Sequence, residues 1–296
     1  LAENEVVARK HFEEVMPMME CFQQKFGTYP FVNDGYKLVE TPYLGMEHQS
    51  AVAYGNKYTK GYLGNDMTGT GIGLEFDFII IHETGHEWFG NSITSKDIAD
   101  MWIHESFTTY SECVYVECQF GYEKAMAYIN GQKKLIANQK PVIGQFGVNY
   151  KTGNSDMYYK GALMLNTIRH IINDDTKWWA MLKKYAETYR YKIIETKDVV
   201  AFFSKESGLN LSPIFDQYLK HKAFPELELK FNEGTIDFRW KTDVENFKMP
   251  FECKIGTKSL RYEATNAWQS APIQLKNPTD FKLDENKFLF TSSVVK

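Results

Sequence analysis

The chain has 296 residues, of which 43% are hydrophobic and 24% charged, an ordinary composition for a globular protein with material for one large domain or two unequal ones. The formal net charge of -4 gives no reason to expect nucleic acid or an anionic membrane as a partner. No run of 18 apolar residues occurs, so the sequence predicts no membrane-spanning helix.

The first predicted element is an amphipathic helix. Apolar residues recur at helical spacing between Val7 and Phe22, and Pro17 marks a kink or a junction between two helices. From Tyr29 to Tyr62 the helical period disappears, and turn-forming residues separate apolar stretches that suggest short strands. Glu47 is expected on or beside an edge strand.

The next stretch holds the strongest chemical signal of the chain, His82-Glu83-Thr84-Gly85-His86. Its two histidines are one helical turn apart, so both imidazoles can reach one metal ion while Glu83 stands beside it. The residues from Phe76 to Phe89 are mostly apolar, which predicts a buried helix that ends at Gly90-Asn91. Two buried histidines are better explained by metal ligation than by packing.

A second helix is predicted from about Asp100 through Tyr115, and Glu105 lies in its first turns with eighteen residues between His86 and itself. Catalytic zinc sites commonly combine three protein ligands with an open position for water, and His82, His86 and Glu105 would make such a set. The rival third ligands are His104, Asp97, Asp100 and Glu112. His104 points about a quarter-turn away from Glu105, so only one of the two can face the metal. Asp100 and Glu112 are also candidates to hold a ligand imidazole from outside the ligand set.

More helices follow along the chain. One is predicted over Tyr122 to Asn138, and after a loop over Gln139 to Ser155 another begins at a cap on Asp156 and runs through Ile172. Three further helices are predicted over residues 178–189, 197–207 and 212–224. After Pro225 apolar and polar residues alternate, which predicts a small β-sandwich of about 70 residues.

The cysteines give no sign of a metal site. The chain has four of them, Cys21, Cys113, Cys118 and Cys253, and none belongs to a C-x-x-C pair. Cys113 and Cys118 share a predicted helix but face different directions, so a bridge between them is not expected. We expect buried free thiols.

Together, these motifs resemble the M1 family of zinc aminopeptidases. The stretch from His82 to Asn91 fits the family's extended pattern H-E-x-x-H-x-W-F-G-N at every fixed position, and Glu105 follows at the family's interval. Leu44-Gly45-Met46-Glu47-His48-Gln49 resembles the exopeptidase motif G-x-M-E-N, with one residue fewer before Met46 and with His48 where asparagine is commoner. Tyr158-Tyr159-Lys160-Gly161-Ala162 resembles the segment Y-x-K-G-A, whose first tyrosine is catalytic in the family. The resemblance covers residues 1 to about 222.

The resemblance implies an α+β fold in two domains. Residues 1–222 would form a thermolysin-like zinc metallopeptidase domain, mainly helical with a small mixed or antiparallel sheet. Residues 223–296 would form a β-sandwich domain, matching the β domain that follows the catalytic domain in many relatives. One zinc ion, held by His82, His86 and Glu105, is the implied cofactor.

The implied activity is removal of the N-terminal residue from a peptide. Zinc would acidify its water toward a pKa of ~7 and polarise the scissile carbonyl. Glu83 would be the general base, and the hydroxyl of Tyr158 would stabilise the negative oxygen of the tetrahedral intermediate. Tyr159 is the rival for that role from the residues alone, although on a helix it would point about 100° away.

An exopeptidase must also recognise a free α-ammonium group. The resemblance assigns this to the carboxylate of Glu47, and backbone groups of Gly45 and Met46 would hold the peptide by strand addition. Without the surrounding motif, Glu47 would be interpreted as a solvated strand carboxylate. Peptides with a free N-terminus are therefore the expected partners.

One departure from the family concerns what precedes the motifs. M1 enzymes normally carry an N-terminal β domain that closes the cleft, and Leu1 to Glu5 look like a cut within a longer chain. We therefore expect a monomeric fragment whose partner is the missing N-terminal domain of the same protein. Two other functions stay open: a zinc hydrolase of other specificity, either an endopeptidase or an epoxide hydrolase, and a non-catalytic docking fragment with structural zinc. Glu83 argues against the last, because a structural zinc site has no use for a general base.

Overall fold

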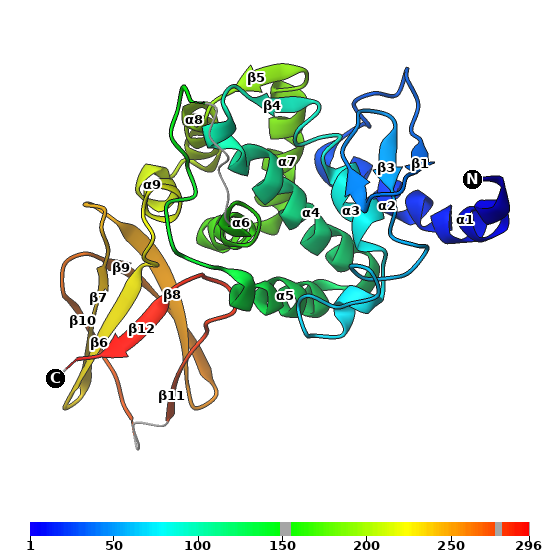
Figure 1. Ribbon diagram of the computed structural model, residues 1–296. Helices are drawn as coiled ribbons and strands as arrows, with labels where there is room; N and C mark the ends of the chain where they lie inside the picture. Colours follow the sequence, from blue (N-terminus) through cyan, green and yellow to red (C-terminus); the bar gives the residue numbers. More distant parts are fainter. Residues whose placement is uncertain (149–154, 276–279, 296) are drawn as a thin grey trace.

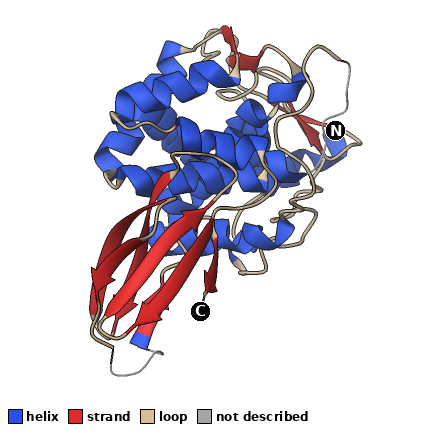
Figure 2. Cartoon of the chain, turned by 90° about the vertical axis from the view of Figure 1, so that its left-hand side faces the viewer, coloured by secondary structure: helices blue, strands red, loops and turns tan. Residues whose placement is uncertain are grey.

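The computed structural model describes residues 1–148, 155–275 and 280–295. Helices dominate the chain up to about residue 220, and strands make up the rest (Figure 1). Seen from the side, the long C-terminal strands lie together below the helical body (Figure 2). The mixed α+β class is as predicted. Residues 149–154 of the predicted loop 139–155 lie outside the described residues.

The N-terminal helix is broken, as the sequence predicts, but not at the proline. Helix α1 (Glu5–His11) and helix α2 (Val15–Phe26) are joined by a 3₁₀ turn over Phe12–Glu14. Pro17 lies in the first turn of α2, where its missing N–H would have had no helical partner. The chain therefore breaks ahead of Pro17.

A small mixed sheet follows and confirms the predicted short strands. Its members are β1 (Leu38–Glu40), β2 (Gly45–Met46) and β3 (Val52–Tyr54). The order is β1-β3-β2, with β1 parallel and β2 antiparallel to the central strand. Strand β2 is thus an edge strand, and Glu47 comes directly after it, as predicted.

Two buried helices occupy the centre of the helical body. Helix α3 (Phe78–Gly85) is capped by Asp77, whose carboxylate accepts hydrogen bonds from the backbone N–H groups of Ile79 and Ile80. Helix α4 (Trp102–Phe120) is buried from its first residue through Val116. The predicted end of α3 at Gly90-Asn91 is wrong, because the backbone leaves the helix after Gly85 and turns back toward strand β4 (Ile93–Ser95).

The next two helices are shorter than predicted. Helix α5 (Tyr122–Gly131) tightens into a 3₁₀ turn that ends at Leu135, and helix α6 (Tyr159–Ile172) follows the loop. The predicted cap at Asp156 is wrong. Its carboxylate instead accepts the N–H groups of residues 137 and 138, which fastens the end of the α5 segment to the start of α6.

The remaining helices agree closely with the sequence. They are α7 (Asp175–Thr188), α8 (Thr196–Ser207) and α9 (Ser212–Lys220). Strand β5 (Lys192–Ile194) has no counterpart among the predictions; it pairs in parallel with β4 across about a hundred residues of chain.

The C-terminal strands form two sheets that face each other. One sheet has the order β10-β7-β6-β12 and the other the order β11-β8-β9. Their members are β6 (Glu226–Asn232), β7 (Thr235–Lys241), β8 (Lys248–Ile255), β9 (Lys258–Thr265), β10 (Gln269–Pro272), β11 (Phe281–Leu283) and β12 (Thr291–Val294). The ring of Phe238 in β7 lies 5.1 Å from that of Phe251 in β8 and 5.3 Å from that of Tyr262 in β9. Aromatic packing therefore joins the sheets.

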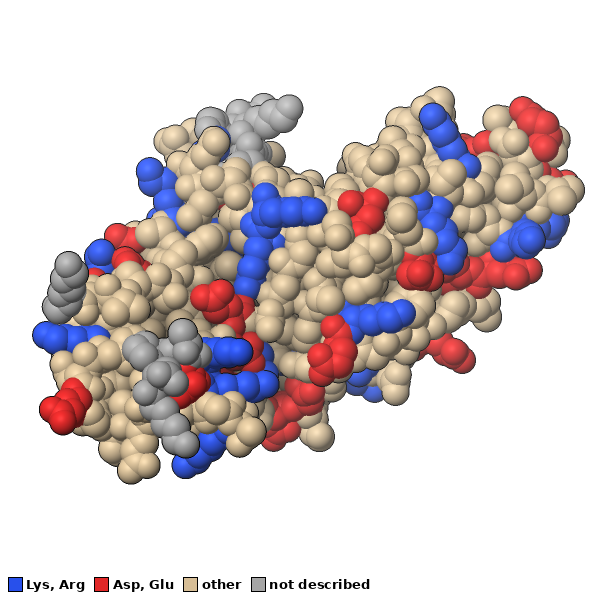
Figure 3. Space-filling view, turned by 90° about the horizontal axis from the view of Figure 1, so that it is seen from below, with Lys and Arg blue, Asp and Glu red and all other residues tan. Residues whose placement is uncertain are grey.

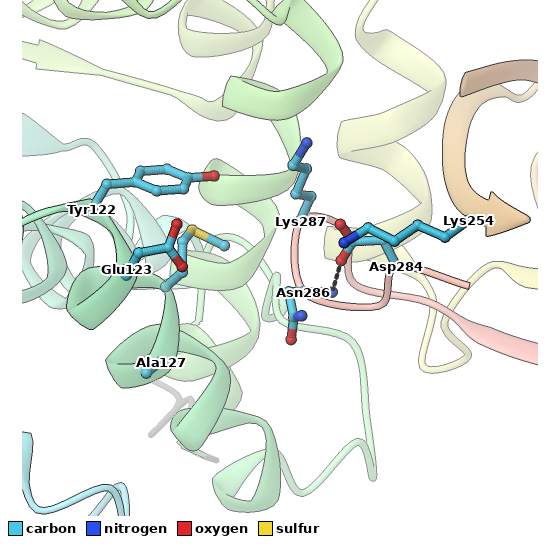
Figure 4. A pocket seen from close by; sticks show the side chains of 8 residues that line it. Tyr122, Glu123, Ala127, Lys254, Asp284, Asn286 and Lys287 are labelled. Carbon is cyan, nitrogen blue, oxygen red and sulfur yellow. Dashed lines mark hydrogen bonds between the residues drawn. The ribbon is translucent and has the colours of Figure 1, made fainter. Parts of the chain in front are cut away.

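The strands meet the helical body along the segment between β11 and β12. The side chain of Asn130 in α5 donates to the carbonyl of Asn286 over 2.9 Å, and the N–H of Leu289 donates to Thr167 in α6 over 3.0 Å. A cavity of about 400 Å³ opens beside this seam, with Tyr122 on its α5 side and Lys254 on its strand side (Figure 4).

Two of the cysteines differ from expectation. Cys21 in α2 and Cys118 in α4 form a disulfide, whereas Cys113 and Cys253 are buried free thiols. The prediction of free thiols is wrong for the first pair because the fold brings together helices that are 97 residues apart in sequence.

The face of the molecule in Figure 3 shows no large patch of one charge. On the face in Figure 3, acidic and basic side chains are interspersed. Within the described residues, no helix has the length and the apolar character needed to cross a bilayer.

Candidate functional site

Helix α3 carries the two histidines of the motif on one side. Its residues from Ile79 to Gly85 are all buried, so the helix is held by apolar contacts around most of its surface. The rings of His82 and His86, one turn apart, have centroids 5.0 Å from each other. Although α3 ends at Gly85, the backbone of His86 keeps helical angles, which preserves this spacing.

Helix α4 brings Glu105 to the same point. Its Oε2 lies 3.6 Å from His82 Nε2 and 3.3 Å from His86 Nε2, and ligand atoms of the three residues lie within 4.8 Å of one another. This oxygen is buried and has no hydrogen-bond partner among the residues that the structure describes. An orphaned carboxylate oxygen facing two imidazole nitrogens needs a cation, and two nitrogens with one oxygen are a donor set that suits zinc. The residues present therefore fit a metal ion.

Both imidazoles are oriented from their far side. His82 Nδ1 lies 2.7 Å from the carboxylate of Glu112, and His86 Nδ1 lies 3.0 Å from the carbonyl of Phe89. These acceptors place a proton on each Nδ1, which leaves each Nε2 lone pair free for a metal. Glu112 is held in turn by the hydroxyl of Tyr128 at 2.7 Å.

Burial and charge act against each other at these residues. Burial alone would lower the pKa of His82, but the carboxylates of Glu105 and Glu112 raise that pKa well above its ordinary value. Burial alone would raise the pKa of Glu105, but the imidazoles of His82 and His86 hold it well below its usual range. The site thus favours positive charge between these groups, which protons or a metal cation can supply.

Glu83 stands next to the three candidate ligands without joining them. Burial raises the pKa of its carboxyl above the ordinary value. The carboxylate is close to strand β2: a Cβ on Gly45 would lie 3.0 Å from Glu83 Oε1 and 2.8 Å from the side chain of Ile79. Only glycine at position 45 lets the edge strand approach the metal helix this closely.

The segment over residues 44–49, which resembles the exopeptidase motif, lies close to Glu83 and His86. Ligand atoms of Glu47, Glu83 and His86 fall within 4.8 Å of one another. Gly45 and Met46 pair with Tyr54 and Ala53 of β3, and no strand of the described part of the chain pairs with the other edge of β2. The side chains of Met46 and His48 are exposed.

Tyr158 reaches the site and Tyr159 does not. The hydroxyl of Tyr158 lies 3.2 Å from Glu105 Oε1, and burial together with that carboxylate raises its pKa. The hydroxyl of Tyr159 points instead to Met67 Sδ, 4.0 Å away. Tyr158 is placed by close packing of α6 on α4: Ser106 donates to the carbonyl of residue 157, and a Cβ on Gly161 would lie 1.7 Å from Ser106 Oγ.

The rival ligands are engaged elsewhere. His104 Nε2 accepts the N–H of Ser95 at 2.8 Å, and burial lowers the pKa of His104 to about 4, so the ring is a neutral acceptor. Asp100 accepts from the N–H and hydroxyl of Thr196, and Asp97 caps the turn before α4. Asp100 and Glu112 are also the candidates to orient a ligand imidazole. Glu112 contacts the imidazole of His82, whereas Asp100 bonds to Thr196.

Thr108 is not among the site residues predicted from the sequence, and no contact between Asn91 and the segment around Glu47 is predicted. Thr108 Oγ1 lies 3.1 Å from His86 Nδ1, and Asn91 Nδ2 donates to the carbonyl of Glu47 over 2.8 Å. Thr108 follows Glu105 by three positions on α4, a spacing that places it on the same face and would have identified it.

A cavity of about 300 Å³ adjoins the candidate centre. His82, Glu83 and Tyr158 are among the residues that line it. The rest of its wall is mainly apolar and aromatic: Leu44, Gly45, Tyr62, Met67, Phe78, Ile79, Thr109, Glu112, Ser155 and Tyr159.

Comparisons with known proteins find relatives of this chain among aminopeptidases. The chain is 24% identical to mouse aminopeptidase B over 168 residues, which cover 50% of this chain and 26% of that protein. It is 23% identical over 203 residues to aminopeptidase N of Lactococcus lactis subsp. lactis, covering 64% of this chain and 23% of that protein. The chain thus spans about a quarter of these relatives.

Solved structures of M1 zinc metallopeptidases have a similar fold. The M1 zinc metallopeptidase from Deinococcus radiodurans superposes with a TM-score of 0.58 and 20% identity, over 72% of this chain and 44% of that one. A variant of that enzyme bound to a Tyr-Ser-Ala substrate superposes with a TM-score of 0.56 and 20% identity, over 70% of this chain and 44% of that one. Residues 10–218 match the peptidase family M1 domain. The chain therefore belongs to peptidase family M1.

Proposed function

We propose that the protein contributes the catalytic centre of a zinc-dependent aminopeptidase. The observation that carries the proposal is the buried, unpartnered Oε2 of Glu105 between two imidazole nitrogens, with Glu83 and Glu47 beside them. The aminopeptidase names of the relatives support it. The substrates would be peptides with a free N-terminus.

The metal would be zinc, held by His82, His86 and Glu105. When bound, it would supply Lewis-acid polarisation of the scissile carbonyl and acidify water at this point. Glu112 and the carbonyl of Phe89 would keep both imidazoles in the tautomer that presents Nε2.

The chain's own groups would move the protons. Glu83 would take a proton from the attacking water and give it to the leaving amine, a role that suits a carboxyl whose pKa burial has raised. Tyr158, kept protonated by its raised pKa, would donate its hydroxyl hydrogen to the negative oxygen that forms on the substrate.

Substrate register would come from the segment around Glu47. Its carboxylate would pair with the α-ammonium group, and the free edge of β2 at Gly45 and Met46 would hold the peptide backbone. We place the side chain of the N-terminal residue in the adjoining cavity, whose apolar and aromatic wall suits an apolar group such as leucine.

We further propose a thermolysin-like peptidase domain over residues 1–222 and a β-sandwich domain over residues 223–296. The family match ending at residue 218 and the two facing C-terminal sheets support this division.

The test compares L-leucine amide with its N-acetylated counterpart. We expect cleavage of the free-amine substrate alone, and we expect Glu83→Gln to lower kcat by about 10²- to 10⁴-fold with zinc content unchanged. The control is Glu20→Gln, the same replacement on an exposed residue of α2. Equal rates on both substrates would point to an endopeptidase or another hydrolase, and unchanged activity in Glu83→Gln would remove the catalytic role of that residue.

A further inference from the structure

The turn after α3 links the two motifs that the proposed reaction needs. The backbone N–H of Asn91 donates to the carbonyl of His86 over 2.9 Å, while its side-chain Nδ2 donates to the carbonyl of Glu47 over 2.8 Å. Residues 47 and 91 are 44 positions apart in sequence. A single asparagine is therefore bonded both to a candidate metal ligand and to the candidate amine-binding residue.

We propose that Asn91 is a positioning residue that fixes the Glu47 carboxylate at a set distance from the metal-binding histidines. This inference rests on the proposed function and adds to it a residue that touches neither substrate nor metal. Asn91 would act only through the backbone of Glu47.

The segment has few other restraints near Glu47. Strand β2 ends at Met46, and the next side chains, His48 and Gln49, are exposed. The N–H of His48 donates to the carbonyl of Met46 within the segment, and Gln49 Nε2 donates to Asp34 over 3.1 Å. Neither bond ties residue 47 to the metal-binding motif. The hydrogen bond from Asn91 thus falls at the point where sheet pairing stops. Without it, the Glu47 backbone could move relative to α3, although β2 itself would stay paired.

A second contact from the turn after α3 holds the far end of the same segment. The buried carboxylate of Glu87 accepts the N–H of Ser50 at 2.7 Å. Ser50 has a φ of 57°, a left-handed conformation that a non-glycine residue keeps only when its surroundings impose it. Asn91 and Glu87 hold the segment between residues 47 and 50 at both ends, so the turn after α3 determines the position of this segment relative to His86.

The distance between the Glu47 carboxylate and the metal-binding histidines matters because one substrate must place its amine at Glu47 and its scissile bond at the metal at the same time. Glu47, Glu83 and His86 already lie within 4.8 Å of one another. A shift of about 1 Å in a positioned group is enough to cost about 10²-fold in rate. Loss of the Asn91 contact should therefore weaken recognition of the free amine specifically, without loss of metal.

The test measures binding, so it does not depend on turnover. The probes are L-leucine hydroxamate and N-acetyl-L-leucine hydroxamate, which share the metal-binding hydroxamate and differ in the free amine. Their affinities for the zinc-loaded chain are measured by calorimetry, and the ratio of the two affinities is the readout. Zinc content is measured for each variant.

We expect the wild type to prefer the free amine and Asn91→Ala to lower this preference by about tenfold, toward the ratio of Glu47→Gln. Affinity for the acetylated probe should not change. Asn91→Leu, which keeps the volume but loses the donor, should behave as Asn91→Ala and covers the case that the smaller side chain unfolds the turn. The matched control is Thr94→Val, which removes the hydroxyl that donates to the carbonyl of Gly90 over 2.7 Å and to the carbonyl of Asn91 over 3.5 Å. This variant leaves the Asn91 side chain and its bond to Glu47 in place.

The outcomes separate the two proposals. A wild-type preference that survives in Asn91→Ala and Asn91→Leu overturns the positioning role and leaves the proposed function standing. A wild type without preference removes the amine site from Glu47, and the inference falls with it. An equal loss in Thr94→Val also overturns the proposal, because the effect would then belong to the turn as a whole.

Discussion

The candidate metal site depends on one carboxylate oxygen, Glu105 Oε2. Glu105 Oε2 is buried without a hydrogen-bond partner and faces the Nε2 atoms of His82 and His86. Replacing Glu105 by alanine removes one of three ligands and leaves two buried imidazoles without their carboxylate. We expect Glu105→Ala to hold far less than the about one zinc per chain expected of the wild type, measured by elemental analysis after dialysis.

The control is Glu123→Ala, which removes an exposed carboxylate from α5. If Glu105→Ala kept its zinc, or if the wild type bound none after zinc loading, the three-residue site would be wrong.

Glu112 should tune the same site from outside. It accepts from His82 Nδ1 at 2.7 Å and is itself held by Tyr128 and Gln132. A neutral amide in its place accepts less strongly, so the imidazole becomes a weaker ligand. We expect Glu112→Gln to lower zinc affinity by about 10- to 100-fold in a chelator competition.

Asp100→Asn is the comparison for Glu112→Gln. Asp100 is an equally buried carboxylate close to the start of α4, but it binds Thr196 and no imidazole. The Asp100→Asn variant should keep the wild-type zinc affinity. A similar loss of zinc affinity in both variants would mean that Glu112 acts only through the stability of the fold.

Among single residues, the sequence identifies the site residues that are close together along the chain. The two histidines and Glu83 lie within one turn, so the helical period alone relates them. The distinction between Glu112 and Asp100 was out of reach, because it depends on which side of α4 meets α3. Only the packed pair of helices determines that side.

At the scale of elements, the errors fall where a tertiary contact replaces a local signal. Asp156 has the right residue type and place to cap α6, yet it binds the N–H groups of residues 137 and 138. Strand β5 is three residues long and exists through its pairing with β4. Neither contact leaves a trace in the local pattern, because the partners are distant in sequence.

The disulfide between Cys21 and Cys118 should stabilise the contact of α2 with α4. It closes a loop of 97 positions, and constraining such a loop in the unfolded chain is worth about 2–4 kcal/mol. We expect Cys21→Ser to lower the free energy of unfolding of the oxidised protein by that amount, measured with urea under non-reducing conditions. The matched control is Cys253→Ser, at a free buried thiol.

A thiol titration checks the pairing itself. Unfolded without reductant, the oxidised protein should show two reactive thiols of its four, those of Cys113 and Cys253. Four thiols would contradict the disulfide, and Cys21→Ser would then cost no more than the control.

For the whole molecule, the sequence predicted the change from helices to strands near Pro225 but not how the two parts meet. Lys160 of α6 is fully buried and donates to the carbonyls of His221 and Lys222, just before the first C-terminal strand. Arg261 of β9 donates to the carbonyl of His170 at the end of α6. Such contacts join residues more than 60 positions apart, so no local period reports them.

We expect His170 to make this seam sensitive to acid. Its Nδ1 lies 2.7 Å from the carbonyl of Asn166 and its Nε2 3.0 Å from the hydroxyl of Tyr122, an arrangement that suits the neutral ring. Burial, helped by the charge of Arg169, lowers the pKa of His170 to about 4. The unfolded chain, with an ordinary pKa of about 6.5, binds this proton more readily. The contribution of His170 to stability should therefore be full above pH 6.5 and fall as the pH drops toward 4.

The share of His170 in that loss is up to about 3 kcal/mol. His170→Gln cannot take up the proton, so its free energy of unfolding should change less between pH 7 and pH 4.5 than that of the wild type, measured with urea at both values. His104, whose pKa burial also lowers to about 4, keeps its own share in both proteins, so the slope should flatten without vanishing. The control is His48→Gln, the same replacement at an exposed histidine. If the slope of His170→Gln equalled that of the wild type, the acid response would belong to other groups, and the seam between helices and strands would not depend on the charge of this ring.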